Sequence, residues 1–415
     1  MKSLLILAAL LAAVPDAQSD IKADLTRAGA NSNSYEFPEI RDSRAPRGYK
    51  PFYISHYGRH GSRSNWGGRT YRLVIDELSA AGEAGLLTEA GEKTLAEARA
   101  VYEAWGGMDG RLSQRGAREH AKIAGRLYHR YPRVFRRGSR KIRSVASVVP
   151  RCLISMNAFT QSLTKIDPKL CFTFDTGEKL MEYISNTGND ESWEQMEGVW
   201  TKMQEIYALP YDTVAVMPLL FTDTAAARQF VPDCGALENA MYDVASIAED
   251  WDIEEDIYPL LPFDLVWKRY SATNHDLYFN HCNSLEYGDI RVPFAKSLSD
   301  DIIAKADEAI AGGEYCADLR FGHDHPLLGL LSYMGVEGVG ERLSWDEVDA
   351  KWFGYKYIPM ASNLQFIFYR NRAGKVLVKI LYQEQETLLK GLEPDVAPCF
   401  YEWGNLKEHF SVYSR

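Results

Sequence analysis

Short apolar runs and longer amphipathic stretches alternate along this chain. The β-prone runs predict strands over residues 50–56, 141–147, 316–322, 363–369 and 375–382. A turn that contains Asn and Gly separates the last two runs, and this arrangement predicts a β-hairpin.

Helical periodicity, with apolar side chains recurring every three to four residues, follows most of these strands. It predicts helices over residues 70–81, 89–105, 113–131, 152–163 and 326–334. Strands that alternate with helices are typical of an α/β fold. We expect an open, mainly parallel sheet with helices on both faces.

The middle of the chain differs in composition from the segments on either side. Residues 166–285 are rich in Trp, Tyr, Met and acidic side chains, and they show helical spacing without clear strands. We interpret them as a mostly α-helical cap inserted between two halves of an α/β core, residues 20–165 and 286–415. The polar, turn-rich residues 20–48 are expected to form a surface lead-in.

The first 19 residues (1–19) have the three parts of a secretory signal peptide. Lys2 supplies the basic start, Leu4–Val14 the apolar run and Ala17–Ser19 a cleavage site of small residues. No other stretch of the sequence approaches the roughly 20 apolar residues that span a bilayer. We therefore expect a secreted or periplasmic protein in an oxidising compartment.

Six cysteines would permit up to three disulfides in such a compartment. They are Cys152, Cys171, Cys234, Cys282, Cys316 and Cys399. None belongs to a Cys-x-x-Cys pair, so the sequence gives no support to zinc-ribbon or thioredoxin chemistry.

The overall composition limits the functions that the chain can have. Its 415 residues are 46% hydrophobic and 25% charged, as is typical of a globular protein with a large core. The formal net charge of −10 disfavours nonspecific binding of nucleic acid. An acidic protein can still bind an anionic substrate if it gathers arginines into one pocket.

The segment Ser55–Arg63 carries the strongest chemical signal in the sequence. Arg59 and Arg63 flank His60 and offer planar pairs of donors that suit phosphate oxygens. A neutral imidazole is nucleophilic and can carry a phosphoryl group covalently. Because this glycine-containing loop ends a predicted strand, it favours phosphoryl transfer over a surface loop with incidental charges.

A second candidate pair, His323-Asp324, follows the strand predicted over residues 316–322. Asp324 would protonate the leaving oxygen and later activate water, and His323 would donate to the phosphate. The alternative is that Asp324 only caps the helix that begins near Pro326.

Three other classes of function are alternatives. A metal phosphohydrolase would use His323, Asp324 and His325 as ligands, although the sequence lacks the usual histidine-rich metal patterns. A cysteine phosphatase would need a Cys-x-x-x-x-x-Arg loop, which is also missing. An inactive binding protein is disfavoured because both His60 and Asp324 are present.

The loop around His60 resembles the hallmark Arg-His-Gly-x-Arg-x-Pro of the histidine acid phosphatase branch of the histidine phosphatase superfamily. Arg59, His60, Gly61 and Arg63 match this pattern, and Asn65 stands where the family usually has proline. The resemblance implies the histidine phosphatase fold.

The resemblance continues along the chain. Arg111–Gly116, followed by His120, is similar to the helix-start segment of the family, and Arg151 falls at the spacing of a further phosphate-pocket arginine. His323-Asp324 matches the distal pair. The resemblance implies that the protein needs no metal and no cofactor. The implied roles are nucleophile for His60, general acid and base for Asp324, and phosphate binding for Arg59, Arg63, Arg151 and His323.

Within the family, Pro359–Gln365 and Phe368–Asn371 are similar to the multiple inositol polyphosphate phosphatase group, especially its bacterial secreted members. That group usually has His-Ala-Glu at the distal site, so His323-Asp324 is more similar to the His-Asp phytases. The resemblance implies stepwise hydrolysis of inositol hexakisphosphate (phytate) and lower inositol phosphates, with a broad-specificity acid phosphatase as the alternative. We expect a monomer or simple homo-oligomer with no nucleic-acid partner and no membrane span.

Two features remain outside this interpretation. His56 and His120 are interpreted as packed scaffold residues. The basic run between Arg133 and Arg143 either extends the pocket toward a multiply charged substrate or forms a solvated helix end.

Overall fold

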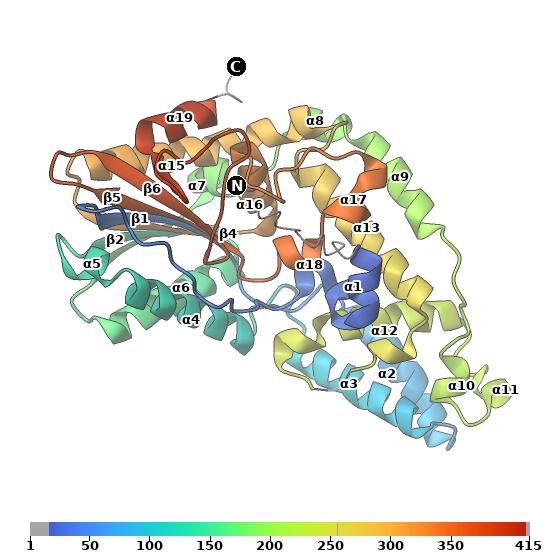
Figure 1. Ribbon diagram of the computed structural model, residues 1–415. Helices are drawn as coiled ribbons and strands as arrows, with labels where there is room; N and C mark the ends of the chain where they lie inside the picture. Colours follow the sequence, from blue (N-terminus) through green and yellow to red (C-terminus); the bar gives the residue numbers. More distant parts are fainter. Residues whose placement is uncertain (1–15, 255, 412–415) are drawn as a thin grey trace, which may run out of the picture.

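The computed structural model describes residues 16–254 and 256–411, which contain one eight-stranded sheet with helices on both faces (Figure 1). The strand order is β3-β2-β4-β1-β5-β6-β7, and β8 pairs with β6. The strands are β1 (Lys50–Arg59), β2 (Lys141–Ala146), β3 (Cys171–Thr176), β4 (Tyr315–Gly322), β5 (Asn363–Arg370), β6 (Val376–Tyr382), β7 (Gln385–Glu386) and β8 (Phe400–Glu402).

The four strands β3, β2, β4 and β1 run parallel to one another, whereas β5 and β6 are antiparallel. This confirms the expected α/β sheet and the hairpin. The carboxyl ends of parallel strands meet at one edge, so the segments after β1, β2 and β4 come together there.

Both faces of the sheet are buried. Tyr53 and Ile54 are neighbours in β1 and both are fully buried, yet they belong to hydrophobic cores on opposite faces, as the two-residue period of a strand requires. Figure 1 shows the helices of the two layers on either side of the sheet. One layer contains α4 (Gln114–Arg130), α5 (Pro132–Arg136) and α6 (Pro150–Ile166), and the other α7 (Glu178–Ile184), α15 (Lys296–Ile310), α16 (Asp324–Met334) and α19 (Trp403–Ser411).

A separate helical lobe lies beside the sheet (Figure 1). Its core joins α1 (Ala17–Ala23), α2 (Gly68–Glu83), α3 (Glu89–Trp105), α12 (Cys234–Ala248) and the first half of α13 (Phe263–His281). The second half of α13 packs into the core of the sheet, so this helix connects the two bodies. Helices α2 and α3 therefore pack with α12, which is distant in sequence, rather than on the sheet.

The helix ends follow the local sequence. Helix α3 has the predicted bounds, and α4 begins after Ser113, whose hydroxyl accepts a hydrogen bond from the Gly116 amide at 3.0 Å. Proline residues stand at the first helical positions of α5 and α6, where their missing N–H costs no helical hydrogen bond.

The segment of residues 166–285, which showed no clear strand in the sequence, contains the strand β3. This edge strand pairs in parallel with β2, but most of its side chains are exposed. β3 pairs with a neighbour along one edge, and neither of its faces is deeply buried. The alternation of hydrophobic and polar residues in its sequence is therefore a weak signal of a strand. Elsewhere the segment is helical in the described residues, with α8 (Asp190–Glu194), α9 (Glu197–Tyr207), α10 (Met217–Leu220) and α11 (Thr224–Ala227).

The prediction that residues 20–48 form a surface segment is wrong for part of that segment. Residues Leu25–Ser32 form a 3₁₀ helix in which Ala28 and Ala30 are fully buried, and Tyr35 is buried just after it. Small side chains allow this polar segment to pack closely. It lies between the two bodies and brings Asn31 to the edge of the sheet.

All six cysteines are free thiols, so none of the disulfides considered above is formed in the described residues. Five of the six are buried and only Cys171 is exposed. Residues 1–15 of the predicted signal peptide lie outside the described residues. Ala17 opens α1 and is fully buried, so cleavage after Ser19 would remove the first turn of that helix. No helix in the described part of the chain is long and apolar enough to cross a membrane.

Candidate active site

The loop after β1 is fixed by backbone contacts at the carboxyl edge of the sheet. The amide of His60 donates to the carbonyl of Gly322 at 2.9 Å, which ties this loop to the end of β4. The loop also lies directly against the start of α4. A Cβ on Gly61 would lie 2.5 Å from the Gly116 carbonyl oxygen, and a Cβ on Gly116 would lie 2.3 Å from that of Ser62. Both positions need glycine because two backbones touch there.

His60 is 1% exposed and its tautomer follows from one contact. Its Nδ1 atom lies 3.0 Å from the carbonyl oxygen of Gly61. A carbonyl can only accept, so Nδ1 carries the proton and Nε2 keeps its lone pair. Burial and the nearby cations, Arg59 first among them, hold the pKa of His60 well below its usual value. The imidazole is therefore neutral and nucleophilic at Nε2.

Arg59 is completely buried at the end of β1. Its Nη1 atom donates to the carbonyl oxygens of Asn31 and Ile358, both at 2.6 Å. Its Nη2 atom lies 2.9 Å from Oδ2 of Asp324. These contacts fix the guanidinium plane before any ligand arrives.

Two further arginines, Arg63 and Arg151, lie close to His60. Burial lowers the pKa of Arg63 to about 10, and the charges of Arg59 and Arg151 contribute to this shift. Burial also lowers the pKa of Arg151. The Nη1 atom of Arg63 donates to the Ser64 carbonyl and to the Asn65 side chain, both at 2.9 Å. Three guanidinium groups around one imidazole make a local site for an anion in an acidic protein.

His323 also reaches this site, with its ring centre 5.7 Å from that of His60. Arg151 donates to Nδ1 of His323 at 3.2 Å, so the Nε2–H group of His323 donates to the hydroxyl of Ser147 at 3.0 Å. Burial lowers the pKa of His323 to about 3, which keeps the ring neutral. In this conformation both ring nitrogens are occupied and the ring orients Arg151. The expected donation from His323 to a phosphate stays a prediction.

Asp324 is the first residue of α16 and is 6% exposed. Its Oδ2 atom accepts from Arg59 and from the side-chain amide of Asn31, both at 2.9 Å. Burial alone would raise the pKa of Asp324, but the charge of Arg59 holds it well below its usual value. The N-cap position of α16 belongs to His323. Asp324, one residue later, accepts from the adjacent backbone amide of His325 through Oδ1, which leaves Oδ2 to Arg59 and Asn31.

Trp66 is 60% exposed and covers two of the arginines. The guanidinium carbons of Arg63 and Arg151 lie 4.7 and 5.5 Å from its ring centre. A Cβ on Gly110 would lie 3.0 Å from Arg151 Nη1 and 3.3 Å from the Trp66 ring, so this glycine leaves room for the stack. The sequence pattern had given no reason to include Trp66 in the site.

Two buried carboxylates hold the loop from behind. Glu119 accepts from both the amide and the hydroxyl of Ser62, at 2.9 and 2.8 Å. Asp250 accepts from Ser34 at 2.9 Å and from the Arg63 amide at 3.4 Å. Burial, with the charge of Glu119, raises the pKa of Asp250 to about 7. Neither carboxylate stands out in the sequence, because their partners are distant along the chain.

His56 and His120 lie beneath the loop and are each 1% exposed. Their rings pack against Phe321, and burial lowers the pKa of both to about 3. They are packed residues of the scaffold. The basic run does not extend the pocket. Arg140 precedes β2 and binds Asp167, and Arg143 lies within β2 and binds Asp318, so both charges are paired before the strand reaches the site at Ala146.

The structure gives no support to the alternative of a metal site built on His323, Asp324 and His325. The described residues contain no group of three or more His, Cys, Asp or Glu side chains that could hold an ion. The ring of His325 instead stacks on that of His281, with centres 3.9 Å apart and planes at 9°.

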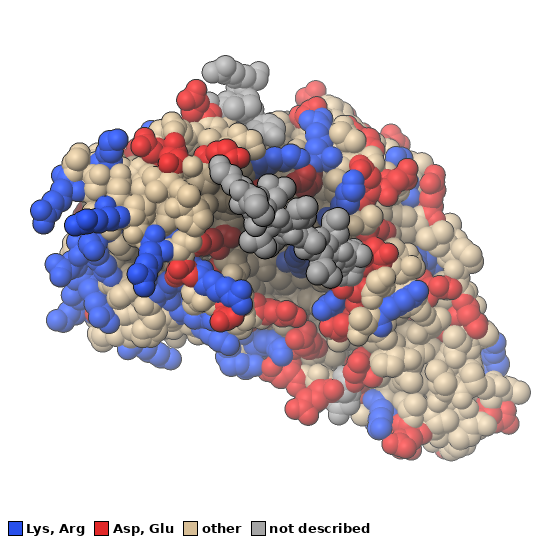
Figure 2. Space-filling view, in the orientation of Figure 1, with Lys and Arg blue, Asp and Glu red and all other residues tan. Residues whose placement is uncertain are grey.

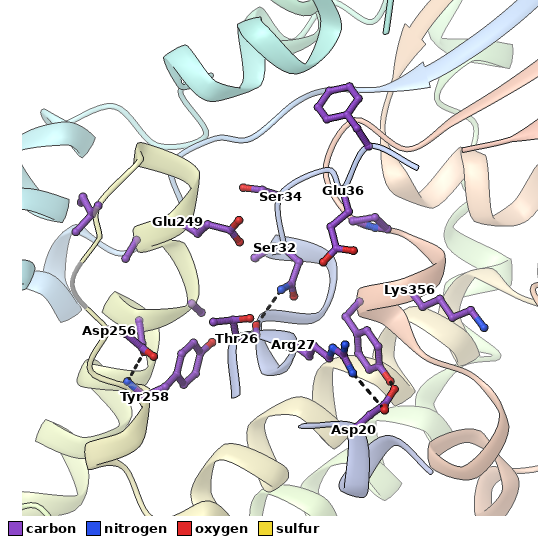
Figure 3. A pocket seen from close by; sticks show the side chains of 18 of the residues that line it. Asp20, Thr26, Arg27, Ser32, Ser34, Glu36, Glu249, Asp256, Tyr258 and Lys356 are labelled. Carbon is purple, nitrogen blue, oxygen red and sulfur yellow. Dashed lines mark hydrogen bonds and ion pairs between the residues drawn. The ribbon is translucent and has the colours of Figure 1, made fainter. Parts of the chain in front are cut away.

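The cavity shown in Figure 3 lies elsewhere, between the N-terminal segment and α12. It has a volume of about 780 Å³, and its charged lining is more acidic than basic, with Asp20, Glu36, Glu249, Glu254 and Asp256 against Arg27 and Lys356. This excess of negative charge disfavours a phosphate ester there, in contrast to the three arginines around His60. Ser34 links it to the site, because this residue lines the cavity and donates to Asp250.

Comparison with known protein families gives a match that spans the residues of the candidate active site. The family model described as "Histidine phosphatase superfamily (branch 2)" matches residues 58–383. The structure is similar to that of a Bifidobacterium longum multiple inositol polyphosphate phosphatase in complex with inositol hexasulfate, with a TM-score of 0.74 and 18% identity, covering 93% of this chain and 98% of that chain. It is also similar to a phytase from D. castellii, with a TM-score of 0.68 and 12% identity, covering 99% of this chain and 90% of that one.

Proposed function

Because the chain belongs to branch 2 of the histidine phosphatase superfamily, a family of phosphatases, we propose that it cleaves phosphate monoesters through a phosphohistidine on His60. One observation carries this proposal most directly. The Nδ1–H group of His60 is committed to the Gly61 carbonyl, which leaves Nε2 free among three arginines.

In the first step, Nε2 of His60 attacks the phosphorus and the bond to the ester oxygen breaks. Arg59, Arg63 and Arg151 balance the charge on the three phosphoryl oxygens, as phosphoryl transfer requires. Asp324 gives its proton to the departing oxygen, so the alcohol leaves in neutral form.

In the second step, water attacks the phosphohistidine. Asp324, now a carboxylate, takes one proton from this water, and inorganic phosphate leaves while His60 returns to its neutral form. In the empty site Asp324 is ionised, because Arg59 binds it. A bound phosphate competes for Arg59, raises the pKa of Asp324 and lets it take up the proton that the first step needs.

The proposed substrates are inositol hexakisphosphate and lower inositol phosphates. Support comes from the C-terminal sequence similarity and from the fold shared with a multiple inositol polyphosphate phosphatase and a phytase. A broad-specificity acid phosphatase of the same mechanism is the second candidate, since the proposed roles of His60, Asp324 and the three arginines concern the transferred phosphate and the leaving oxygen, which all phosphate monoesters share.

A phosphate-release assay on inositol hexakisphosphate and p-nitrophenyl phosphate, each with and without EDTA, tests the function. We expect release from both substrates, unchanged by EDTA and inhibited by vanadate or tungstate. A comparable kcat/KM on both substrates would favour the broad phosphatase. Loss of activity with EDTA and recovery with a divalent ion would contradict the mechanism.

We also propose that the protein is exported, on the basis of the signal peptide predicted in residues 1–19. Mass spectrometry of the protein recovered from the host periplasm or medium tests this directly. Recovery of a chain that still begins at Met1 would contradict export with removal of the signal peptide.

A further inference from the structure

A groove rich in arginine lies at the end of the sheet opposite the candidate active site. It has a volume of about 850 Å³, and five cationic side chains line it without any acidic one. They are Arg47, Lys50, Arg133, Arg370 and Arg372. Figure 2 shows Lys and Arg gathered on this side of the molecule, where Figure 1 places α5 and the β5–β6 hairpin. The protein has a net charge of −10, so this local excess of positive charge is unusual and indicates a binding site for an anion.

The cations of the groove lack carboxylate partners within 4.0 Å in the described part of the chain. Neighbouring basic residues differ, since Arg130 and Lys379 bind Asp42, and Arg140 binds Asp167. The groove cations are thus available to a ligand.

The backbone forces two of these charges together. Lys50 begins β1 and is paired across the sheet with Arg370, the last residue of β5. Like charges directly opposite in an antiparallel pair are destabilising. Arg370 is also held in place, because its Nη2 donates to the Ile310 carbonyl at 2.6 Å and its guanidinium lies 4.2 Å from the ring centre of Phe52. An anion bound between them would remove the repulsion.

We propose that this groove is a second, noncatalytic site that binds a small molecule with several phosphate groups. Five separate cations suit an anion with several charged groups better than a single carboxylate, and guanidinium forks match phosphate oxygens. The volume lies within the range of small-molecule pockets. The groove offers no histidine or carboxylate in its lining, so it binds such a molecule without cleaving it.

The groove is far enough from His60 to be tested separately. Strand β1 spans ten residues from Lys50 to Arg59, a distance of about 30 Å at the rise of a strand. The proposal does not depend on the proposed function, because it rests only on the groove residues and their missing partners.

Isothermal titration calorimetry with inositol hexakisphosphate on the full-length His60→Ala protein tests the proposal, since this variant should prevent turnover. We expect two bound molecules per chain. The added variant pair Arg133→Glu and Arg372→Glu should weaken one of the two sites at least tenfold and leave the other unchanged. In the otherwise wild-type protein, the same pair should leave kcat on p-nitrophenyl phosphate unchanged.

Lys169→Glu and Arg228→Glu form the matched control, because both residues are exposed, lie outside the groove and change the net charge equally. The control pair should keep both sites. Raising the salt concentration should weaken the groove site, as screening of exposed charges requires.

Three results would overturn the proposal. They are binding in the parent protein that the Arg133→Glu and Arg372→Glu pair does not weaken, equal weakening by both variant pairs, and binding through the groove only to vesicles that contain phosphorylated lipids. Inorganic phosphate, with one anionic group, should bind the groove more weakly than the hexakisphosphate. If the candidate active site does not bind the hexakisphosphate, the groove should still bind one molecule, so the two proposals fail separately.

Discussion

Nη2 of Arg59 lies 2.9 Å from Oδ2 of Asp324, and both side chains are almost completely buried. This contact joins the last residue of β1 to the first residue of α16, 265 residues later in the chain. It also makes the charge of Asp324 depend on whether Arg59 is shared with a phosphate. One pair of atoms thus links the phosphate pocket to the proposed proton donor.

Asp324→Asn should destabilise the protein, because it leaves the buried charge of Arg59 without its partner. Breaking such a pair typically costs about 3–5 kcal/mol. The pKa of Asp324 is lowered in the folded protein. Its stabilising effect is therefore fully present above the unfolded pKa, near 3.8, and is lost as the pH falls through the lower folded value. Urea unfolding of both proteins at several pH values should show a difference that narrows only in strong acid. A difference that instead grows below pH 4 would contradict this account.

Asp324→Asn should also distinguish the role of a proton donor to the leaving group from the role of a charge that stabilises the phosphoryl group. Asp324→Asn cannot protonate a leaving group, so turnover of inositol phosphates should fall by about 100- to 10,000-fold. Turnover of p-nitrophenyl phosphate should fall much less, since its leaving group needs little protonation. Arg63→Ala is the control, because it removes a charge that every substrate uses and should slow both reactions alike. Equal losses on both substrates for Asp324→Asn would mean that another group is the acid.

Asp250 should make the protein less stable as the pH rises toward neutrality. Burial raises its folded pKa to about 7, so its contribution is fully present below the unfolded value of 3.8 and is lost as the pH rises through about 7. The difference between these values corresponds to roughly 4 kcal/mol. Asp250→Asn should therefore flatten the dependence of the unfolding free energy on pH between 4 and 8. The idea fails if the variant keeps the wild-type slope.

Trp66→Ala should weaken phosphate binding without stopping turnover. The ring lies over the guanidinium groups of Arg63 and Arg151, and a cation–π contact is worth about 0.5–2 kcal/mol. We expect the inhibition constant of inorganic phosphate to rise between twofold and thirtyfold, with a smaller change in kcat. Trp200→Ala is the matched control, because Trp200 is similarly exposed at 64% but lies on α9 and contacts no arginine that the structure records. Similar effects in both variants would rule out a specific role for Trp66.

The sequence was informative where chemistry is local. Arg59 ends a strand, His60 and Arg63 follow it directly, and Gly61 between them meets a second backbone. The spacing of Arg151 and the pair His323-Asp324 became meaningful only through resemblance to a family. The structure brings these side chains together at one edge of the sheet, and their catalytic roles remain the proposal that the experiments address.

The sequence was uninformative where partners are far apart. Asn31 donates to Asp324 across 293 positions, and Asp250 reaches Arg63 across 187, so no local pattern marks either residue. The polar composition of residues 20–48 suggested a surface segment, because burial there depends on small side chains rather than hydrophobic ones. Strand β3 was missed for the opposite reason, since it is a real strand with exposed faces.

The central claim is that His60 carries the phosphoryl group during turnover. Rapid acid-free quenching of the wild-type protein with radiolabelled inositol hexakisphosphate, followed by peptide mapping, tests it most directly. The account predicts a phosphate on the peptide that contains His60, stable in base and labile in acid, and absent from His60→Ala, which should also have lost turnover. Full turnover in His60→Ala, or a label on another residue, would contradict it.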